Sequence, residues 1–163
     1  MKNQKGITLV ALAITIIVMI IIASISSYYG KDLIKQAKIQ DLRTNMLLIQ
    51  AETKKGLEET KFQKINLEEA KANNIIIGTK LSEASSEVQS AASGKLGAID
   101  SETCYYLSEQ DLSNMGLSDI DEQKNGYFIV SYNLSEITVE VINTNGYKGK
   151  YTLAEINDLS EEQ

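Results

Sequence analysis

The feature that most constrains this chain is an uncharged N-terminal stretch. From Gly6 to Gly30 the sequence contains no charged residue. The residues from Ile7 to Tyr29 are apolar apart from a few hydroxyls, which bond to carbonyls one helical turn earlier. This length suffices to cross a bilayer core, for which a helix needs ~20 apolar residues. Since a helix that is apolar on every side is not a normal core helix, the sequence predicts a membrane-spanning helix at residues 7–29.

The charges that flank this stretch do not by themselves settle its orientation. Lys2 and Lys5 precede it, and four basic residues follow it, which are Lys31, Lys35, Lys38 and Arg43. A positive-inside count therefore does not favour a cytoplasmic N-terminus. However, residues 1–6 are too few to form a domain, and a very short charged segment before an apolar stretch normally stays in the cytoplasm. We expect a single-pass protein of the cell membrane with its N-terminus in the cytoplasm.

A conventional secretory signal peptide is an alternative interpretation of the same residues. Lys2 and Lys5 would form its charged region and residues 9–22 its apolar region. A small-residue cleavage site would lie around Ala23, Ser24 and Ser26. In that case the mature protein would begin beyond residue 23 and would be secreted without the helix.

Composition excludes several classes of function. The formal net charge is −6, and it becomes −8 without Lys2 and Lys5, so we expect no nucleic acid partner. The chain has no His and a single cysteine, Cys104. Zinc sites, Cys-His catalysis and Ser-His-Asp triads are therefore excluded within one chain. We predict no catalytic residue, no cofactor and no enzyme activity, and we interpret Cys104 as a buried apolar filler.

The residues Lys5-Gly6-Ile7-Thr8-Leu9-Val10, with the uncharged run after them, resemble the prepilin N-terminal motif of type IV pilins and type II secretion pseudopilins. The motif combines a basic leader that ends in Gly, a hydrophobic residue after the cleavage point, and Thr-Leu-Val at the next three positions. Some pilin-like proteins of Gram-positive anaerobes are similar. The resemblance implies that a prepilin peptidase cleaves between Gly6 and Ile7, that the new amino group of Ile7 is N-methylated, and that the apolar helix stays attached.

The resemblance also implies how such a chain would assemble. In pilin-like filaments the apolar helices leave the lipid bilayer and pack against those of other pilin-like subunits, which places the protein at the cell surface or outside the cell. Packing of this kind depends on van der Waals fit and on small residues. The residues of the predicted membrane and assembly helix are Thr8, Leu9, Val10, Ala11, Ala13, Ile16, Ile17 and Ala23.

One position departs from the family pattern. Pilins normally carry Glu at the fifth mature position, where this chain has Ala11. In the family, that Glu is thought to pair with the N-terminal amine of a neighbouring subunit, which Ala11 cannot do. Both a major pilin and a minor pseudopilin therefore remain open. A non-assembling, single-pass membrane protein whose head binds a ligand also remains open.

Beyond the apolar stretch, the pattern becomes that of an amphipathic helix. Ile39, Leu42, Met46 and Ile49 recur at intervals of three and four, which places them on one face. We therefore predict one continuous helix from about Ile7 to about Leu57, weakened near its end by Gly56. The predicted fold class is α+β and pilin-like, with residues 30–57 as the amphipathic half of this helix, packed on a small antiparallel sheet.

The remaining residues divide by composition. Residues 58–125 are predicted to be a variable αβ connector with short helices capped by Asn66 and Ser108. Residues 126–155 are rich in aromatic and β-branched residues and predict an antiparallel meander, followed by an acidic tail at 156–163. The expected strands are 127–132, 137–142 and 150–153, and the expected turns between them are 133–136 and 143–146.

Two clusters in the head have both a functional and a structural interpretation. Asp119, Asp121, Glu122 and Asn125 offer oxygen ligands for calcium, but their spacing matches no EF-hand loop, so solvated loop charges are favoured and no metal is predicted. Several tyrosines suit half-buried positions on strands, where the ring packs and the hydroxyl stays hydrated, better than an adhesive patch. They are Tyr105, Tyr106, Tyr127, Tyr132, Tyr147 and Tyr151.

Overall fold

The structure is a computed structural model. It describes residues 4–118 and 120–161, and within these ranges it does not describe the side chains of residues 4–11, 13, 22–32, 123, 160 and 161. The chain divides into two compact units, Met1–Gln40 and Asp41–Gln163. Helix α1 (Gln4–Gln63) contributes residues to both units, and all other elements belong to the second unit.

Helix α1 confirms the predicted continuous helix but corrects its end. The helix continues past Leu57 to Gln63. Gly56 does not weaken an end, because it lies in the helix interior, where a Cβ atom would come within 2.3 Å of the carbonyl oxygen of Ile75. Glycine is required here for close approach of another backbone segment rather than for termination.

The predicted apolar stripe of α1 is found. Met46 and Ile49 are fully buried, as is Leu57 one turn beyond the prediction, and Leu42 is half-buried. In the first unit Ile39 is also buried. The stripe of the second unit packs on the sheet, since spacing of three and four residues keeps these side chains on one side of the helix.

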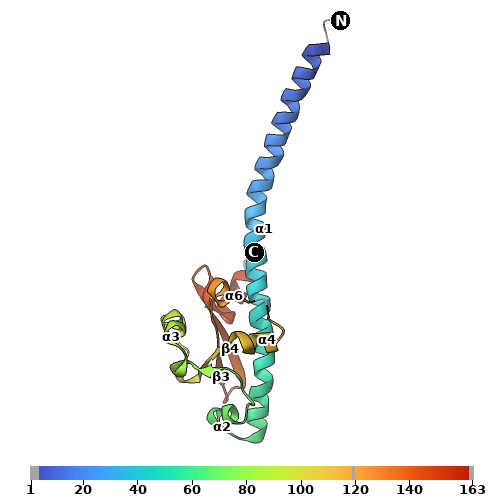
Figure 1. The fold of residues 1–163 in the computed structure, drawn as a ribbon. Helices are drawn as coiled ribbons and strands as arrows, with labels where there is room; N and C mark the ends of the chain where they lie inside the picture. Colours follow the sequence, from blue (N-terminus) through green and yellow to red (C-terminus); the bar gives the residue numbers. More distant parts are fainter. Residues whose placement is uncertain (1–3, 119, 162–163) are drawn as a thin grey trace. The chain divides into compact units, whose positions relative to one another are not determined.

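The second unit contains a five-stranded antiparallel sheet in the order β1-β2-β3-β4-β5 (Figure 1). The strands are β1 (Thr79–Lys80), β2 (Cys104–Leu107), β3 (Phe128–Asn133), β4 (Thr138–Tyr147) and β5 (Lys150–Thr152). The helices besides α1 are α2 (Leu67–Ala72), α3 (Ser86–Ala92), α4 (Glu109–Asn114), α5 (Glu122–Asn125) and α6 (Leu153–Glu161), with 3-10 turns η1 (Leu81–Glu83) and η2 (Ser101–Thr103). The fold is therefore α+β, with a long helix packed on a small antiparallel sheet, as predicted.

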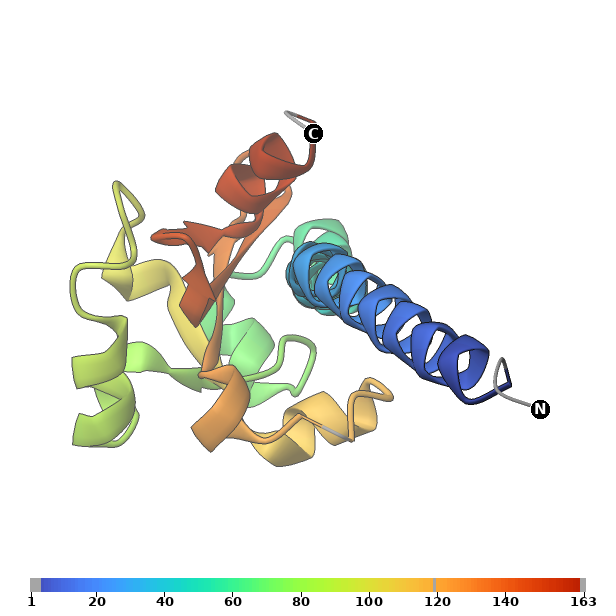
Figure 2. The same cartoon turned by 90° about the horizontal axis from the view of Figure 1, so that it is seen from above.

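The two faces of the sheet are covered by different elements. Successive residues of a strand point to opposite faces. Residues 41–63 of α1 cover one face, and Gln50 Nε2 in this segment donates to the carbonyl oxygen of Val139 at 2.7 Å. On the other face, Ile129 and Ile142 pack with Val88 of α3. Figure 2 shows α3, in yellow-green, on this second face of the sheet.

The second turn predicted in the meander, at residues 143–146, is not found, so this prediction is wrong. Strand β4 continues through residues 143–146 with an irregularity in register between Ile142 and Tyr147. The side chain of Asn143 accepts hydrogen bonds from the backbone of Asn145 and Gly146, so the Asn-rich segment forms a bulge rather than a turn. The chain reverses at residues 148–149 instead. The first predicted turn is confirmed, with Asn133 Oδ1 accepting bonds from Ser135 N and Glu136 N.

The segment predicted as an acidic tail instead forms part of a helix over its described residues. Residues 153–161 form α6, and Leu153 and Ile156 of this helix are buried. These two apolar residues are one helical turn apart, which gives a short amphipathic helix despite the surrounding acidic residues. Glu155 accepts hydrogen bonds from the backbone N–H groups of Tyr151 and Thr152, and these fix the start of the helix.

The predicted connector contributes two strands to the sheet. β1 and β2 lie in it, and β2 pairs with β3 over its whole length. The helix caps predicted there are confirmed, since Asn66 and Ser108 both form capping boxes. Tyr105 and Tyr132 are buried, with an edge-to-face contact at 5.3 Å between ring centroids, whereas the other four tyrosines of the cluster are half-buried. All six tyrosines are therefore at least half-buried, as the structural interpretation predicts.

Candidate functional site

The apolar segment of α1 from Leu12 to Ile21 is the main candidate for a functional element. Its large apolar side chains are exposed, from 46% at Val18 to 71% at Met19. Residues 16–21 are consecutive large apolar residues, and six consecutive positions pass around a whole helical turn. Thr15 is polar, and its hydroxyl donates to the carbonyl oxygen of Leu12 at 2.8 Å. The segment therefore presents apolar surface on all sides and has no group suited to catalysis.

Most of the predicted processing and assembly residues lie outside the described residues. This holds for the leader residues 1–3 and for the side chains of Gly6, Ile7, Thr8, Leu9, Val10, Ala11, Ala13 and Ala23. Ile16 and Ile17 are described, and both are exposed. No helix within the described residues has the length and the apolar character needed to cross a membrane. The cleavage point between Gly6 and Ile7 stays a prediction.

The structure does not gather the calcium candidates into a ligand set. Asp119 lies outside the described residues. Asp121 forms an ion pair with Lys124 at 3.1 Å, and Glu122 Oε1 accepts a hydrogen bond from the Tyr106 hydroxyl at 2.6 Å. In the part of the chain that the structure describes, no group of three or more His, Cys, Asp or Glu residues is placed to hold a metal ion.

The contact between Tyr106 and Glu122 joins α5 to β2. Burial raises the pKa of the Glu122 carboxyl group, the Tyr106 hydrogen bond opposes this change, and nearby Glu109 and Glu87 add to it. The pKa of Tyr106 is also raised, first by burial and then by its bond to Glu122. Tyr127 packs edge-to-face on Tyr106, with 5.9 Å between ring centroids. The Tyr106 hydrogen bond favours the ionised carboxylate of Glu122 and burial favours the protonated form, and burial is the larger of the two effects.

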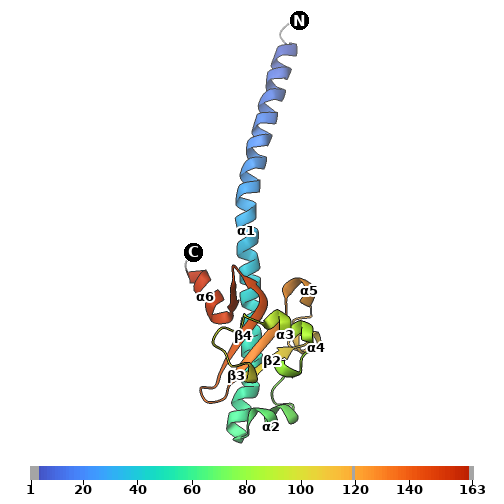
Figure 3. The ribbon, with the colours of Figure 1, turned by 90° about the vertical axis from the view of Figure 1, so that its left-hand side faces the viewer.

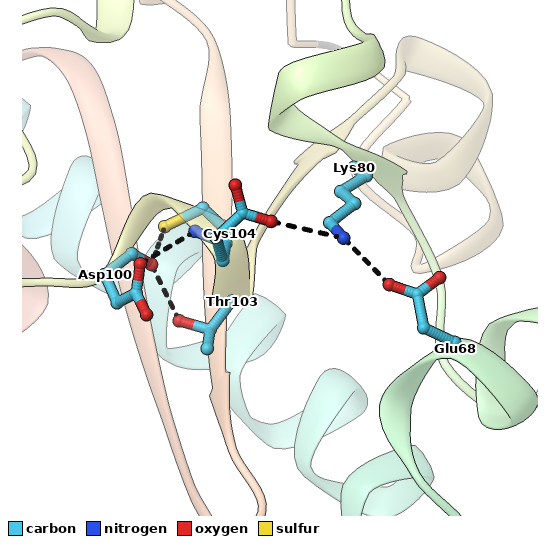
Figure 4. Close-up of polar contacts among 6 residues, drawn as sticks. Glu68, Lys80, Asp100, Thr103 and Cys104 are labelled. Carbon is cyan, nitrogen blue, oxygen red and sulfur yellow. Dashed lines mark hydrogen bonds and ion pairs between the residues drawn. The ribbon is translucent and has the colours of Figure 1, made fainter.

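Cys104 is confirmed as a buried thiol. It is 0% exposed, and burial raises its pKa to about 11, so it stays protonated at neutral pH. Its Sγ atom donates to the carbonyl oxygen of Asp100 at 3.4 Å (Figure 4). A protonated, inaccessible thiol is a poor nucleophile.

A second candidate is a cavity of about 670 Å³ beside the β3–β4 hairpin. Its walls come from the start of α2, the segment around η2, and the β3–β4 hairpin. The lining residues are Asn66, Leu67, Glu68, Ala98, Ile99, Asp100, Thr103, Ser131, Tyr132, Asn133, Leu134, Ser135, Thr138 and Glu140. The volume is within the range of small-ligand pockets. No sequence motif indicated this cavity, because its walls are brought together from three distant segments.

The walls of this cavity are joined by ionic contacts. Lys80 Nζ lies 2.8 Å from Glu68 Oε1 in α2 and 3.4 Å from Glu102 Oε2 in η2 (Figure 4). The pKa of Lys80 is raised, first by its hydrogen bond to Glu68 and then by that to Glu102. Lys80 therefore stays charged and bridges two walls of the cavity.

Comparison with known proteins gives no relative from which a function could be inferred. No protein-family model, no curated protein and no solved structure matches the chain.

Proposed function

We propose that this chain is a structural subunit of a type IV pilus or pseudopilus-like filament. A prepilin peptidase would cleave it between Gly6 and Ile7, and residues 7–29 would hold it in the bilayer before assembly. The observation that supports the proposal is the exposed apolar segment Leu12–Ile21. Leaving one large apolar side chain in water instead of burying it costs about 1.5–3 kcal/mol. A run of such residues therefore requires a covering of lipid or of other helices.

The second unit is consistent with this role. It has a long helix on a small antiparallel sheet, which is the arrangement that the resemblance to pilins leads us to expect. In the proposed filament this unit is the head, and the apolar helix is the element through which subunits assemble.

The residue Ala11 affects how the subunits would assemble. Without a carboxylate at this position, no ion pair with a neighbouring N-terminal amine can form. Assembly would instead depend on the close fit of apolar and small side chains between helices. We therefore expect the proposed filament to be insensitive to salt at its helical core, since salt screens charges and not van der Waals contacts.

The mature N-terminus tests the proposal directly. The full chain is produced in cells that contain a prepilin peptidase, and its mature form is analysed by mass spectrometry. We expect a first residue of Ile7 with a methylated amino group. Gly6→Val should block cleavage, whereas the matched control Gly30→Val, at the other end of the uncharged stretch, should not. A first residue beyond position 23 would instead establish the secretory signal peptide.

The cavity of about 670 Å³ favours a second candidate function. In this alternative the chain is a membrane-anchored protein that does not assemble and whose head binds a ligand. Electron microscopy of material sheared from cells separates the two functions. Filaments that contain the chain support the first, and a chain that stays monomeric in the membrane supports the second.

A further inference from the structure

Strand β4 has groups of opposite charge near its two ends. At its beginning, Thr138 and Glu140 line the cavity described above. Beyond its last residue, the β4–β5 turn carries Lys148 and Lys150. Thr138 is the first residue of β4 and Tyr147 is its last, so the cavity wall and the turn lie at its two ends. Figure 3 shows α2 and α6 toward opposite ends of the sheet.

The β4–β5 turn is short, basic and exposed. Lys148 and Gly149 both have positive φ, 50° and 76°, and Tyr147 pairs with Lys150. A two-residue turn with this conformation is a tight hairpin connection. Lys148 Nζ lies 5.6 Å from the ring centroid of Tyr147, and among the described residues no carboxylate is within ion-pair distance of it. The turn therefore presents an available ammonium group on a rigid support.

The cavity has the complementary charge. Three of its lining residues are carboxylates, Glu68, Asp100 and Glu140, and none is Lys or Arg. Lys80 balances Glu68, and Lys61 donates to the carbonyl oxygen of Leu134 at 3.2 Å. The carboxylates of Asp100 and Glu140 accept hydrogen bonds from backbone N–H groups, of Glu102 and Ala154 respectively. Among the described residues no lysine neutralises them, so their negative charge gives the cavity a preference for cations.

The cavity is also preformed. The hydroxyls of Thr103 and Ser131 are 2.8 Å apart and join η2 to β3. Asp100 Oδ1 accepts a bond from Glu102 N at 3.0 Å, which fixes the start of η2 (Figure 4). Asn133 holds the hairpin through its two backbone bonds. Because these walls are ordered without a ligand, docking loses little conformational freedom.

We propose that the β4–β5 turn of one subunit, Tyr147–Lys150, docks into the cavity of a second copy, with Lys148 directed toward Asp100 and Glu140. The turn cannot reach the cavity of its own chain, because the two lie at opposite ends of β4. A contact between two different surfaces of identical subunits does not close on itself as a two-fold dimer does, and it can repeat into an open filament. The inference rests on the proposed filament function and adds a head-to-head contact to it.

Cysteine cross-linking tests this contact in the full chain. In a Cys104→Ala background, Ser135→Cys places a thiol at the exposed rim of the cavity, and Lys150→Cys places one on the turn while Lys148 keeps its ammonium group. Filaments of this double variant, treated with a short thiol-to-thiol cross-linker, should give a ladder of covalent multimers in denaturing electrophoresis. The matched control combines Ser135→Cys with Lys54→Cys, an exposed lysine on α1, and should give no ladder.

Charge reversal provides a second test without cysteines. Salt should lower the filament yield of the wild type, because it screens the charges of the head-to-head contact. Lys148→Glu should reduce the yield in low salt and remove this salt effect, whereas Lys54→Glu should leave both as in the wild type. A small cation is the rival occupant of the cavity. It is tested by measuring whether spermidine protects Ser135→Cys from a thiol reagent in unassembled chain.

Each result has a definite meaning. A ladder with Lys150→Cys and none with Lys54→Cys, together with loss of yield in Lys148→Glu, supports the contact. Normal filaments that give no ladder and tolerate Lys148→Glu overturn the contact and leave the proposed function intact. A ladder with both lysine positions, or protection by spermidine without a ladder, also overturns it. A chain that never polymerises overturns both.

Discussion

Gly56 is the residue where helix propensity and tertiary packing conflict most directly. It lies inside α1, where glycine is less favourable than alanine by about 1 kcal/mol. However, a Cβ atom at this position would lie 2.3 Å from the carbonyl oxygen of Ile75 and 3.2 Å from its carbonyl carbon. These are backbone atoms, which cannot move aside as the end of a flexible side chain can. Close packing therefore outweighs helix propensity at this position.

We predict that Gly56→Ala destabilises the second unit by about 1–3 kcal/mol, the usual cost of an overpacked site. Denaturant unfolding of the full chain in mild detergent, followed by tyrosine fluorescence, measures the free energy of unfolding. The control is Ala51→Gly, at an exposed position of the same helix, where only the propensity change of about 1 kcal/mol applies. A stabilised Gly56→Ala protein would show that residues 75–76 move away at little cost.

Glu122 should make stability depend on pH. Its pKa is raised in the folded chain, mainly by burial, so its contribution is fully present below the unfolded pKa and is lost as pH rises through the folded pKa. Glu122→Gln keeps an oxygen for the Tyr106 hydroxyl but removes the charge. We therefore expect it to be more stable than the wild type at neutral pH, with a difference that disappears in acid.

Glu155 provides a control of opposite sign. Backbone hydrogen bonds from Tyr151 and then Thr152 lower its pKa, so its contribution is present above the unfolded pKa and is lost as pH falls through the folded pKa. Glu155→Gln should be less stable than the wild type at neutral pH and equal to it in strong acid. Thermal unfolding of the three proteins across pH 3–8 tests both, and parallel curves for Glu122→Gln and wild type would refute the role of Glu122.

At the scale of elements, features formed within a few residues could be predicted from the sequence, whereas features that depend on tertiary packing could not. The caps of α2 and α4 could be predicted because a capping box is formed within a few residues. Strand β2 could not, since Cys104–Leu107 is short and buried at three of its four positions, without the alternation of a half-buried strand. The bulge at Asn143 and the helix α6 were missed for a similar reason, because their sequences also suit a turn and a solvated tail. Only packing on the sheet decides between these alternatives.

Helix α6 gives a direct test at this scale. Ile156 is 0% exposed, so Ile156→Ala should cost about 2–5 kcal/mol, as other large-to-small core changes do. A solvated tail would instead tolerate the change. The control is Asp158→Ala, an exposed residue of the same helix, and we expect less than ~0.5 kcal/mol for it. Equal unfolding free energies for Ile156→Ala and wild type would mean that α6 does not contribute to the core.

At the scale of the whole molecule, the chain combines two kinds of surface. The described part of the first unit exposes most of its large apolar side chains, whereas the second unit buries most of its own around a sheet, with Leu47, Leu48 and Phe62 as exceptions. The first property could be predicted from the sequence, because an unbroken apolar run needs no knowledge of tertiary structure. The cavity could not, since its carboxylates Glu68, Asp100 and Glu140 are far apart in sequence. Any binding by the cavity depends on the folded second unit.

The proposed membrane anchor makes a quantitative prediction. On insertion scales, each lysine near the centre of a spanning helix costs about 2.5–3.5 kcal/mol, so Ile16→Lys combined with Ile17→Lys costs about 5–7 kcal/mol. The Ile, Leu and Val residues contribute only about −0.3 to −0.6 kcal/mol each. We therefore expect Ile16→Lys alone to shift the chain in part from the membrane pellet to the supernatant of lysed cells. The double variant Ile16→Lys with Ile17→Lys should shift it largely. Ile16→Leu with Ile17→Leu keeps the apolar character and should stay in the pellet. Equal pelleting of all three variants would show that these residues do not hold the chain in lipid.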